Sequence, residues 1–179
     1  MRLRRVVLAG ALAGLIFATV QIRATSARQN PQVWGERTIQ LNTEMPEPVR
    51  QIFAQACKNC HSYETEWPWY AKIAPVSWVV ASDVERARKA LNLSDWSITN
   101  GRRPGLAIGA LTAACEGVRT GRMPPQPYRL LHPESRMDAK DVAVFCQWTA
   151  AEVMRQARTR RTGIQKSWYF PYDRASFKK

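Results

Sequence analysis

Two cysteines and a histidine within five residues place the tightest constraint on this chain. Cys57 and Cys60 are separated by two residues, and His61 follows directly in the segment Cys-Lys-Asn-Cys-His. This C-x-x-C-H spacing is the attachment signature of c-type haem. Two thiols three positions apart, on a turn that follows a helix, can reach the two vinyl groups of one porphyrin, and the adjoining imidazole then points at the iron. The motif therefore predicts one covalent haem c, attached at Cys57 and Cys60 with His61 as an iron ligand.

A close cysteine pair can also form a redox dithiol or part of a zinc site, but the rest of the sequence lacks the features that these two sites require. A thioredoxin-like redox dithiol lies between a strand and a helix, and no strand pattern is evident here. A zinc site needs two more ligands at short spacing, and Cys115 and His132 are distant and singly placed. A pattern with three fixed positions also arises by chance. Its weight here comes from agreement with an export signal and with a helical pattern along the chain.

The N-terminus predicts export. Three arginines in the first five residues precede an apolar run over residues 6–22, which is long for a cleavable signal core and at the lower limit for a membrane-spanning helix. Small residues at 25–27 suit cleavage with a mature start near Arg28, whereas Arg23 directly after the run suits a retained inner-membrane anchor. Both interpretations stay open, and both place the remainder outside the cytoplasm, in the periplasm.

The remaining sequence predicts a single helical domain. The length of 179 residues suits one compact domain. Apolar residues recur at helical spacing in four segments, no strand pattern persists, and the fold class is predicted to be all-α, a small cytochrome c-like domain wrapped around one haem behind an N-terminal hydrophobic helix. We expect a signal peptide or anchor over 1–27, a linker over 28–45, the haem-binding domain over 46–154 and a basic, aromatic tail over 155–179.

A six-coordinate haem needs a second axial ligand, and Met123 is the best-placed candidate. It follows Gly121, a natural helix stop, and precedes Pro124 and Pro125, whose rings fix the backbone. Such a rigid loop can hold a thioether against iron, and methionine ligation raises the reduction potential. His132 is the rival ligand, and Met123 as an ordinary packed loop residue is the third interpretation.

Aromatic residues and two further cysteines complete the candidate set. Four aromatic side chains after the motif are expected to cover the porphyrin edges, or else to form ordinary core: Trp67, Trp69, Tyr70 and Trp78. Cys115 and Cys146 lie in separate predicted helices, where they form either a disulfide, favoured in an oxidising compartment, or two buried free thiols.

The net charge of +13 is concentrated at the two ends of the chain, in residues 1–27 and 155–179. An exported protein rarely meets nucleic acid, so we expect no nucleic-acid partner. A basic tail suits anionic lipid headgroups or an acidic redox partner, and a solvated tail is the plainer alternative.

Several segments resemble the bacterial haem-binding domain family, whose members are similar to monohaem cytochromes c. The resemblance covers residues 46 to about 150. It rests on Cys57-Lys-Asn-Cys-His-Ser-Tyr-Glu-Thr-Glu-Trp-Pro-Trp-Tyr70, Ile73-Ala-Pro-Val-Ser-Trp78, Leu91-Asn-Leu-Ser-Asp-Trp96, Gly121-Arg-Met-Pro-Pro125 and Leu130-Leu-His-Pro-Glu134. It implies a covalent haem c with His61 as proximal and Met123 as distal ligand. Cys115, Cys146 and the basic tail depart from the family pattern.

The expected function is one-electron transfer to or from a redox partner protein, as a carrier rather than an enzyme. The first alternative is an open-site haem protein, either a peroxidase or a gas or redox sensor, with His132, Arg122 or Gln126 as the polar residue near the iron. The second is an accessory haem subunit of a membrane complex, which would use the tail aromatics Trp168, Tyr169, Phe170, Tyr172 and Phe177.

Overall fold

The computed structural model describes residues 2–26, 30–96 and 104–161. These residues are mostly helical and include no strand, which confirms the all-α prediction. The tail aromatics lie outside the described residues.

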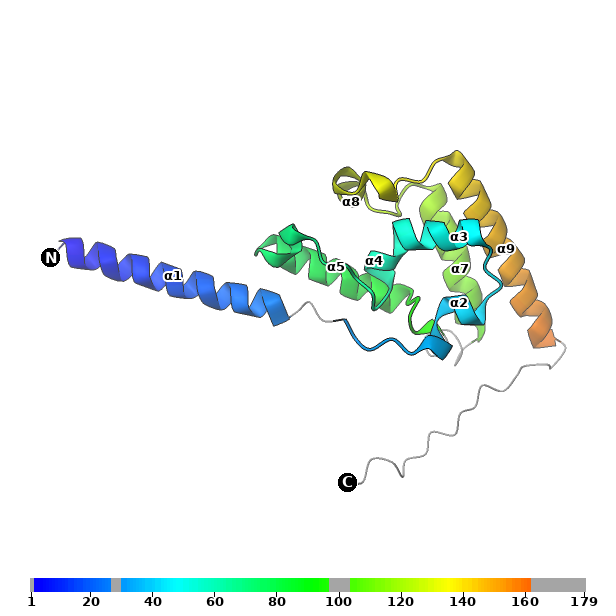
Figure 1. Ribbon diagram of the computed structural model, residues 1–179, viewed down its shortest axis with the longest axis horizontal. Helices are drawn as coiled ribbons and strands as arrows, with labels where there is room; N and C mark the ends of the chain where they lie inside the picture. Colours follow the sequence, from blue (N-terminus) through cyan, green and yellow to red (C-terminus); the bar gives the residue numbers. More distant parts are fainter. Residues whose placement is uncertain (1, 27–29, 97–103, 162–179) are drawn as a thin grey trace, which may run out of the picture.

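Two long helices form the frame of the domain. Helices α7 (Pro104–Arg119) and α9 (Ala139–Arg161) pack side by side, and α3 (Glu47–Ile52) crosses against α9 (Figure 1). A disulfide between Cys115 and Cys146, with Cα atoms 5.0 Å apart, joins the two long helices. Helix α9 starts with a reciprocal cap, because Asp138 and Asp141 each accept a hydrogen bond from the other's backbone N–H.

The apolar core lies between these helices and the segment that leads into the C-x-x-C-H motif. Phe53 meets the rings of Phe145 and Trp148 edge-on, with centroid distances of 5.3 and 5.5 Å. The Trp148 indole donates a hydrogen bond of 2.8 Å to the Glu44 carbonyl, so its polar atom is satisfied. The remaining core side chains are Ile39, Met45, Val49, Ile52, Leu93, Trp96, Leu111 and Val118.

Part of the segment predicted as a linker, residues 28–45, belongs to the domain. It contains the 3-10 turn η1 (Gly35–Arg37) and the short helix α2 (Ile39–Asn42). Ile39 is fully buried, and its backbone N–H donates to the Leu93 carbonyl at 2.8 Å. A single well-placed apolar residue among polar ones carries little periodicity, which is why the sequence pattern did not reveal this contact.

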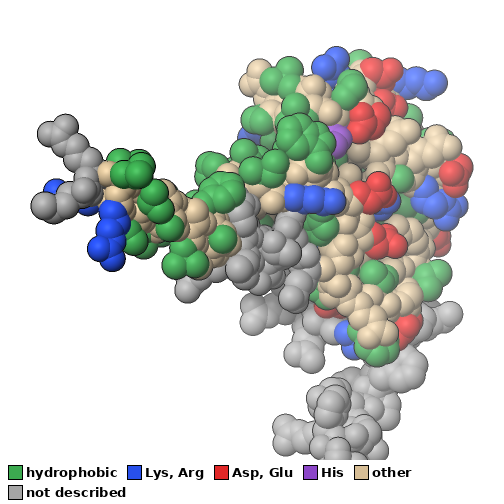
Figure 2. Space-filling view, turned by 60° about the vertical axis from the view of Figure 1, so that its left-hand side comes forward, with side chains coloured by type: hydrophobic (Ala, Val, Ile, Leu, Met, Phe, Trp, Pro, Cys, Tyr) green, Lys and Arg blue, Asp and Glu red, His purple; other side chains and the backbone are tan. Residues whose placement is uncertain are grey.

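The N-terminal segment forms helix α1 (Arg2–Ser26), which stands apart from the other helices (Figure 1). Apolar side chains on it are exposed, and basic side chains lie at its outer end (Figure 2). Among the helices that the structure describes, none combines the length and the hydropathy needed to cross a membrane.

The aromatic stretch after the motif is a tight wrap that leads into α5. Residues Trp69–Lys72 form the 3-10 turn η3, and α5 spans Val76–Ala90. On α5, Val84 is buried, but Val76 and Val79 are 45% and 59% exposed. Periodicity identified the helix, but a face can be apolar without contacting the protein's own core.

Candidate functional site

The C-x-x-C-H motif lies at the end of a helix anchored in the core. Helix α3 continues into a π-helical turn, η2 (Phe53–Cys57), and then into the short helix α4 (Lys58–His61). A π-turn inserts one extra residue per turn, and such turns occur often at functional sites. Because Phe53 at its start is fixed in the aromatic core, the turn presents Cys57, Cys60 and His61 from a rigid base.

Both cysteines of the motif are free thiols and half-buried. Burial, together with the nearby Cys60, raises the pKa of the Cys57 thiol to about 12. Burial and then Asp83 raise the pKa of the Cys60 thiol, and Arg88 lowers it in part. Both groups are therefore neutral thiols at neutral pH rather than reactive thiolates.

The imidazole of His61 is oriented by the carboxyl end of α5. Its Nδ1 lies 3.0 Å from the Leu91 carbonyl oxygen, and its own carbonyl accepts a 2.7 Å hydrogen bond from the Leu93 N–H. Burial lowers the pKa of His61, and the Leu91 and Ala87 carbonyls raise it in part. A neutral ring that donates from Nδ1 leaves the lone pair on Nε2, which is the form that binds a metal.

The residues just after the motif are tied to α5 and to the turn that follows it. The Arg88 guanidinium donates to the Ser62 carbonyl at 2.7 Å and to the Thr65 hydroxyl at 2.8 Å. The Ser94 hydroxyl accepts from the Tyr63 N–H at 3.0 Å. These bonds fix the backbone on the carboxyl side of His61.

Met123 lies in the loop between α7 and α8 (Gln126–Leu131), and the backbone holds it there. Gly121 has a φ of 70°, a left-handed conformation that ends α7 as predicted. The Met123 N–H donates to the Gly117 carbonyl at 2.9 Å, and a Cβ at Gly117 would lie 3.3 Å from the Met123 Cγ. The start of the Met123 side chain therefore packs over a helix position with no side chain, while 43% of Met123 stays exposed.

His132, the rival ligand, has both ring nitrogens engaged. Nε2 lies 2.7 Å from the Tyr70 hydroxyl, and Nδ1 lies 3.0 Å from a Glu134 carboxylate oxygen. The ring stacks on Tyr128 with centroids 4.2 Å apart. Binding iron would require His132 to break at least one of these hydrogen bonds, whereas Met123 has no such competing bond through its sulfur.

Tyr70, Tyr128 and His132 form a cluster, and a hydrogen bond joins this cluster to the C-x-x-C-H motif. The sequence did not predict this connection. Asn59, between the two cysteines, donates from Nδ2 to the Tyr128 hydroxyl at 3.0 Å. Burial raises the pKa of Tyr70, so its phenol stays protonated and can donate to His132. Tyr70 and His132 are 62 positions apart, and no local pattern predicts such a pair.

The aromatic candidates divide into half-buried and exposed groups. Trp67 and Tyr70 are half-buried, but Trp69 and Trp78 are 73% and 47% exposed, so the plain-core interpretation does not hold for these two. Further exposed apolar side chains accompany them just after η3 and on α5 and α8: Ile73, Val76, Val79, Leu130 and Leu131. Helix α5 packs against α4, so the exposed apolar side chains of α5 lie on a helix next to the motif; Figure 2 shows hydrophobic side chains gathered on one face of the domain.

This arrangement fits a porphyrin better than a zinc ion. An exposed apolar surface beside two neutral thiols and an oriented imidazole matches a flat, apolar ligand with a metal at its centre. In the part of the chain that the structure describes, no group of three His, Cys, Asp or Glu side chains is placed to hold a metal ion.

The comparisons with known proteins give one match. The model of a family described as haem-binding domain matches residues 15–151, a span that includes the motif, Met123 and His132. The comparison with curated proteins and the comparison with solved structures give no match.

Proposed function

The chain belongs to the haem-binding domain family, and from this membership we propose that it is a monohaem c-type cytochrome that transfers single electrons outside the cytoplasm. The observation that carries the proposal is the C-x-x-C-H motif on a rigid turn inside the matched span, with a neutral, oriented His61.

Three residues of the motif would hold the group. Cys57 and Cys60 would each form a thioether, for which neutral, protected thiols that escape premature oxidation are suited. His61 would bind iron through Nε2, with the Leu91 carbonyl fixing the ring. When bound, the haem supplies a one-electron iron couple.

Met123 is proposed as the sixth ligand because its loop is rigid and its sulfur uncommitted, while His132 is engaged at both nitrogens. A thioether ligand favours the ferrous state and so raises the reduction potential. If His61 and Met123 both bound the iron, no position would be left for a substrate, which favours an electron carrier over the open-site peroxidase or sensor.

The disulfide, the N-terminal helix and the basic charge support the proposed compartment and partner. A disulfide between Cys115 and Cys146 suits an oxidising compartment such as the periplasm. We propose that α1 acts as the export segment, either removed as a signal peptide or kept as a membrane attachment. An acidic redox partner suits the basic residues of the tail over 155–179.

Spectroscopy on protein matured with a cytochrome c assembly system tests this function. We expect a low-spin ferric spectrum with the weak far-red band of methionine ligation, and a reversible one-electron titration. The far-red band should vanish in Met123→Ala and persist in His132→Ala. A high-spin spectrum with rapid cyanide binding in the unmodified protein would instead support the open-site alternative.

A further inference from the structure

A cluster of side chains joins the segment that carries Met123 to the C-x-x-C-H motif. Asn59, between the two motif cysteines, donates from Nδ2 to the Tyr128 hydroxyl of α8 at 3.0 Å. The Tyr128 ring stacks on the His132 ring, with centroids 4.2 Å apart and an angle of 18° between the planes. The hydroxyl of Tyr70, on η3, lies 2.7 Å from Nε2 of His132. We call Asn59, Tyr70, Tyr128 and His132 the α8 clasp.

Further interactions hold the side chains of the α8 clasp in place. The Oδ1 atom of Asn59 accepts from the Glu66 N–H at 3.1 Å, and Nδ1 of His132 lies 3.0 Å from a Glu134 carboxylate oxygen. Burial raises the pKa of the Tyr128 phenol, and the hydrogen bond from Asn59 lowers it in part. The phenol therefore stays neutral at neutral pH. All four residues of the clasp are half-buried, and partial exclusion of water strengthens their hydrogen bonds.

The position of Met123 is coupled to the position of Tyr128. Three of the four residues that follow Met123 are prolines, whose rings fix the backbone φ, and Pro124 is buried. Arg129 donates from Nη2 to the Gly121 carbonyl at 3.2 Å, which closes the loop from the end of α7 to α8. A contact that fixes Tyr128 therefore also restricts where Met123 lies.

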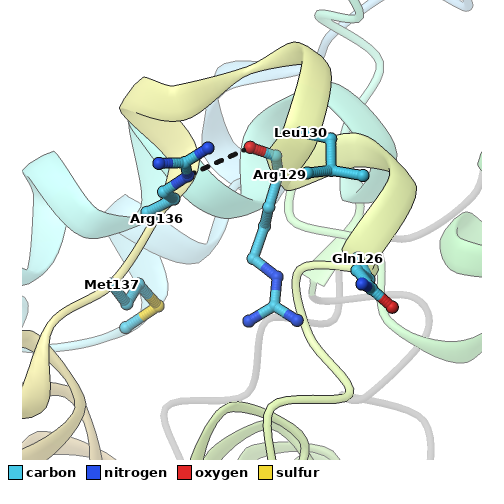
Figure 3. A pocket seen from close by; sticks show the side chains of 5 residues that line it. All are labelled: Gln126, Arg129, Leu130, Arg136 and Met137. Carbon is cyan, nitrogen blue, oxygen red and sulfur yellow. Dashed lines mark hydrogen bonds between the residues drawn. The ribbon is translucent and has the colours of Figure 1, made fainter.

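Other hydrogen bonds join α8 and its loop to the two long helices. The Met123 N–H donates to the Gly117 carbonyl of α7 at 2.9 Å. Arg136 donates from Nε to the Arg129 carbonyl at 3.2 Å, which joins α8 to the segment that leads into α9 (Figure 3). The α8 clasp adds a connection in another direction, to the motif that carries His61. The turn η4 (Pro133–Ser135), which follows α8, packs against η2 and supports the same connection.

We propose that the α8 clasp positions Met123 for the haem iron by holding the Met123 loop in place relative to His61. The inference rests on the proposed function, in which His61 and Met123 bind one iron. The prolines make the loop rigid, but they do not set its place relative to the motif. Asn59 and Tyr128 are therefore positioning residues that act through Met123, and without their hydrogen bond the loop should release the iron more often.

Competition with imidazole in the ferric protein tests the clasp. Imidazole binds the iron when Met123 leaves it, and the far-red band then disappears. Tyr128→Phe removes the hydroxyl that Asn59 contacts and keeps the ring that stacks on His132. We expect the band to be present before imidazole is added and its loss to be about fivefold faster than in the unmodified protein, as expected for one hydrogen bond.

A second variant and a matched control accompany Tyr128→Phe. Tyr70→Phe removes the hydrogen bond to His132 at the other end of the clasp, and a similar acceleration is expected. Tyr63→Phe removes the same atom from another half-buried tyrosine near the motif, and its hydroxyl makes no hydrogen bond to the residues that the structure describes. The control should change the rate by less than about twofold.

A double-mutant cycle assigns the effect to the bond between Asn59 and Tyr128. Asn59→Ala removes the donor and should accelerate the loss of the band about as much as Tyr128→Phe does. In the Asn59→Ala background, Tyr128→Phe should then change the rate by less than about twofold, because the bond is already absent. Two accelerations that multiply in the double variant would show that the residues act separately, and would contradict the proposal.

Hydrogen exchange of the mature exported protein separates the clasp from the proposed function. The backbone N–H groups of Arg129 and His132 are bonded within α8. Tyr128→Phe is expected to speed exchange of the α8 peptide about fivefold and to leave the α9 peptide unchanged, with Tyr63→Phe as the control. Exchange requires no haem, and intact mass reports whether haem is attached in each variant.

The outcomes are distinguishable. Unchanged imidazole kinetics in Tyr128→Phe, with haem attached and the far-red band present, would overturn the proposal and leave the proposed function intact. Faster exchange of α8 without faster loss of the band would overturn it as well, because the clasp would then stabilise α8 without positioning Met123. Absence of haem from the unmodified protein would overturn the proposed function, and unchanged exchange of α8 would in that case reject the clasp independently.

Discussion

The His61 side and the Met123 side of the proposed haem site are built in different ways. Around His61, side-chain and backbone hydrogen bonds join the motif to the end of α5, through Leu91, Leu93 and Arg88. Met123 is held by one backbone hydrogen bond and by packing over Gly117, and 43% of it is exposed. His61 is therefore fixed by several hydrogen bonds, whereas the position of Met123 depends on the conformation of one loop.

The largest effect is expected when the fixed side is broken. His61→Ala removes the imidazole that Leu91 orients, so haem held by two thioethers should lose its low-spin state. The ferric absorption and electron paramagnetic resonance spectra measure this, and His132→Ala is the matched control because that histidine is the other one in the chain. An unchanged spectrum in His61→Ala would show that the iron is bound elsewhere.

The thiols should be protected before haem is attached. With the Cys57 pKa raised to about 12 from its usual 9.0, the thiolate population at pH 8 is roughly 1,000-fold lower than for an unperturbed thiol. In haem-free protein, alkylation of Cys57 is expected to be slowed on the order of 100-fold or more, and to accelerate as the pH rises toward 12, because only the thiolate reacts.

Mass-resolved alkylation kinetics, with the urea-unfolded chain as the reference, would check this. Equal rates for the folded and unfolded chains would show that burial does not protect the thiols.

On the loop side, Met123→Ala should lower the reduction potential. Loss of the thioether removes the preference for ferrous iron, and the expected shift is on the order of 0.1 V. A potentiometric titration measures the shift, and Met154→Ala, an exposed methionine on α9, is the control. Equal potentials in the two variants would remove Met123 from the ligand set.

Arg88 tests whether the hydrogen bonds on the His61 side of the site also stabilise the fold. Arg88→Met keeps much of the apolar stem but loses the hydrogen bonds to Ser62 and Thr65, and we expect the protein to lose about 2 kcal/mol of unfolding free energy. Arg86→Met, on the same helix but with an exposed ion pair, should change stability by less than about 0.5 kcal/mol. Urea unfolding measures the free energy of unfolding of both variants. Equal losses would show that the hydrogen bonds of Arg88 do not stabilise the fold.

Gly117 gives the smallest and most local effect. Alanine is favoured over glycine in a helix by about 1 kcal/mol, but the new Cβ would lie 3.3 Å from the Met123 Cγ. We expect Gly117→Ala to change stability by less than about 1 kcal/mol while weakening or shifting the far-red band. Gly109→Ala, where the added Cβ meets nothing within 4 Å, is the control and should leave the band unchanged.

The sequence predicted the parts of the fold that depend on local pattern. Helical spacing in four segments identified α3, α5, α7 and α9, the Gly121 stop identified the end of α7, and the C-x-x-C-H motif located the candidate site. The burial of Ile39 and the Tyr70–His132 pair depend on contacts between distant segments, which periodicity does not encode. The exposure of Val76 and Val79 is likewise not encoded by periodicity, because helical spacing shows that an apolar face exists but not what covers it.

The central claim is the covalent attachment of one haem through Cys57 and Cys60, and intact-mass analysis of the naturally exported protein tests it most directly. We predict the mass of the chain plus a single haem, with the adduct on the peptide that contains both cysteines and absent when both are replaced by serine. A mature protein without any haem adduct would contradict the account.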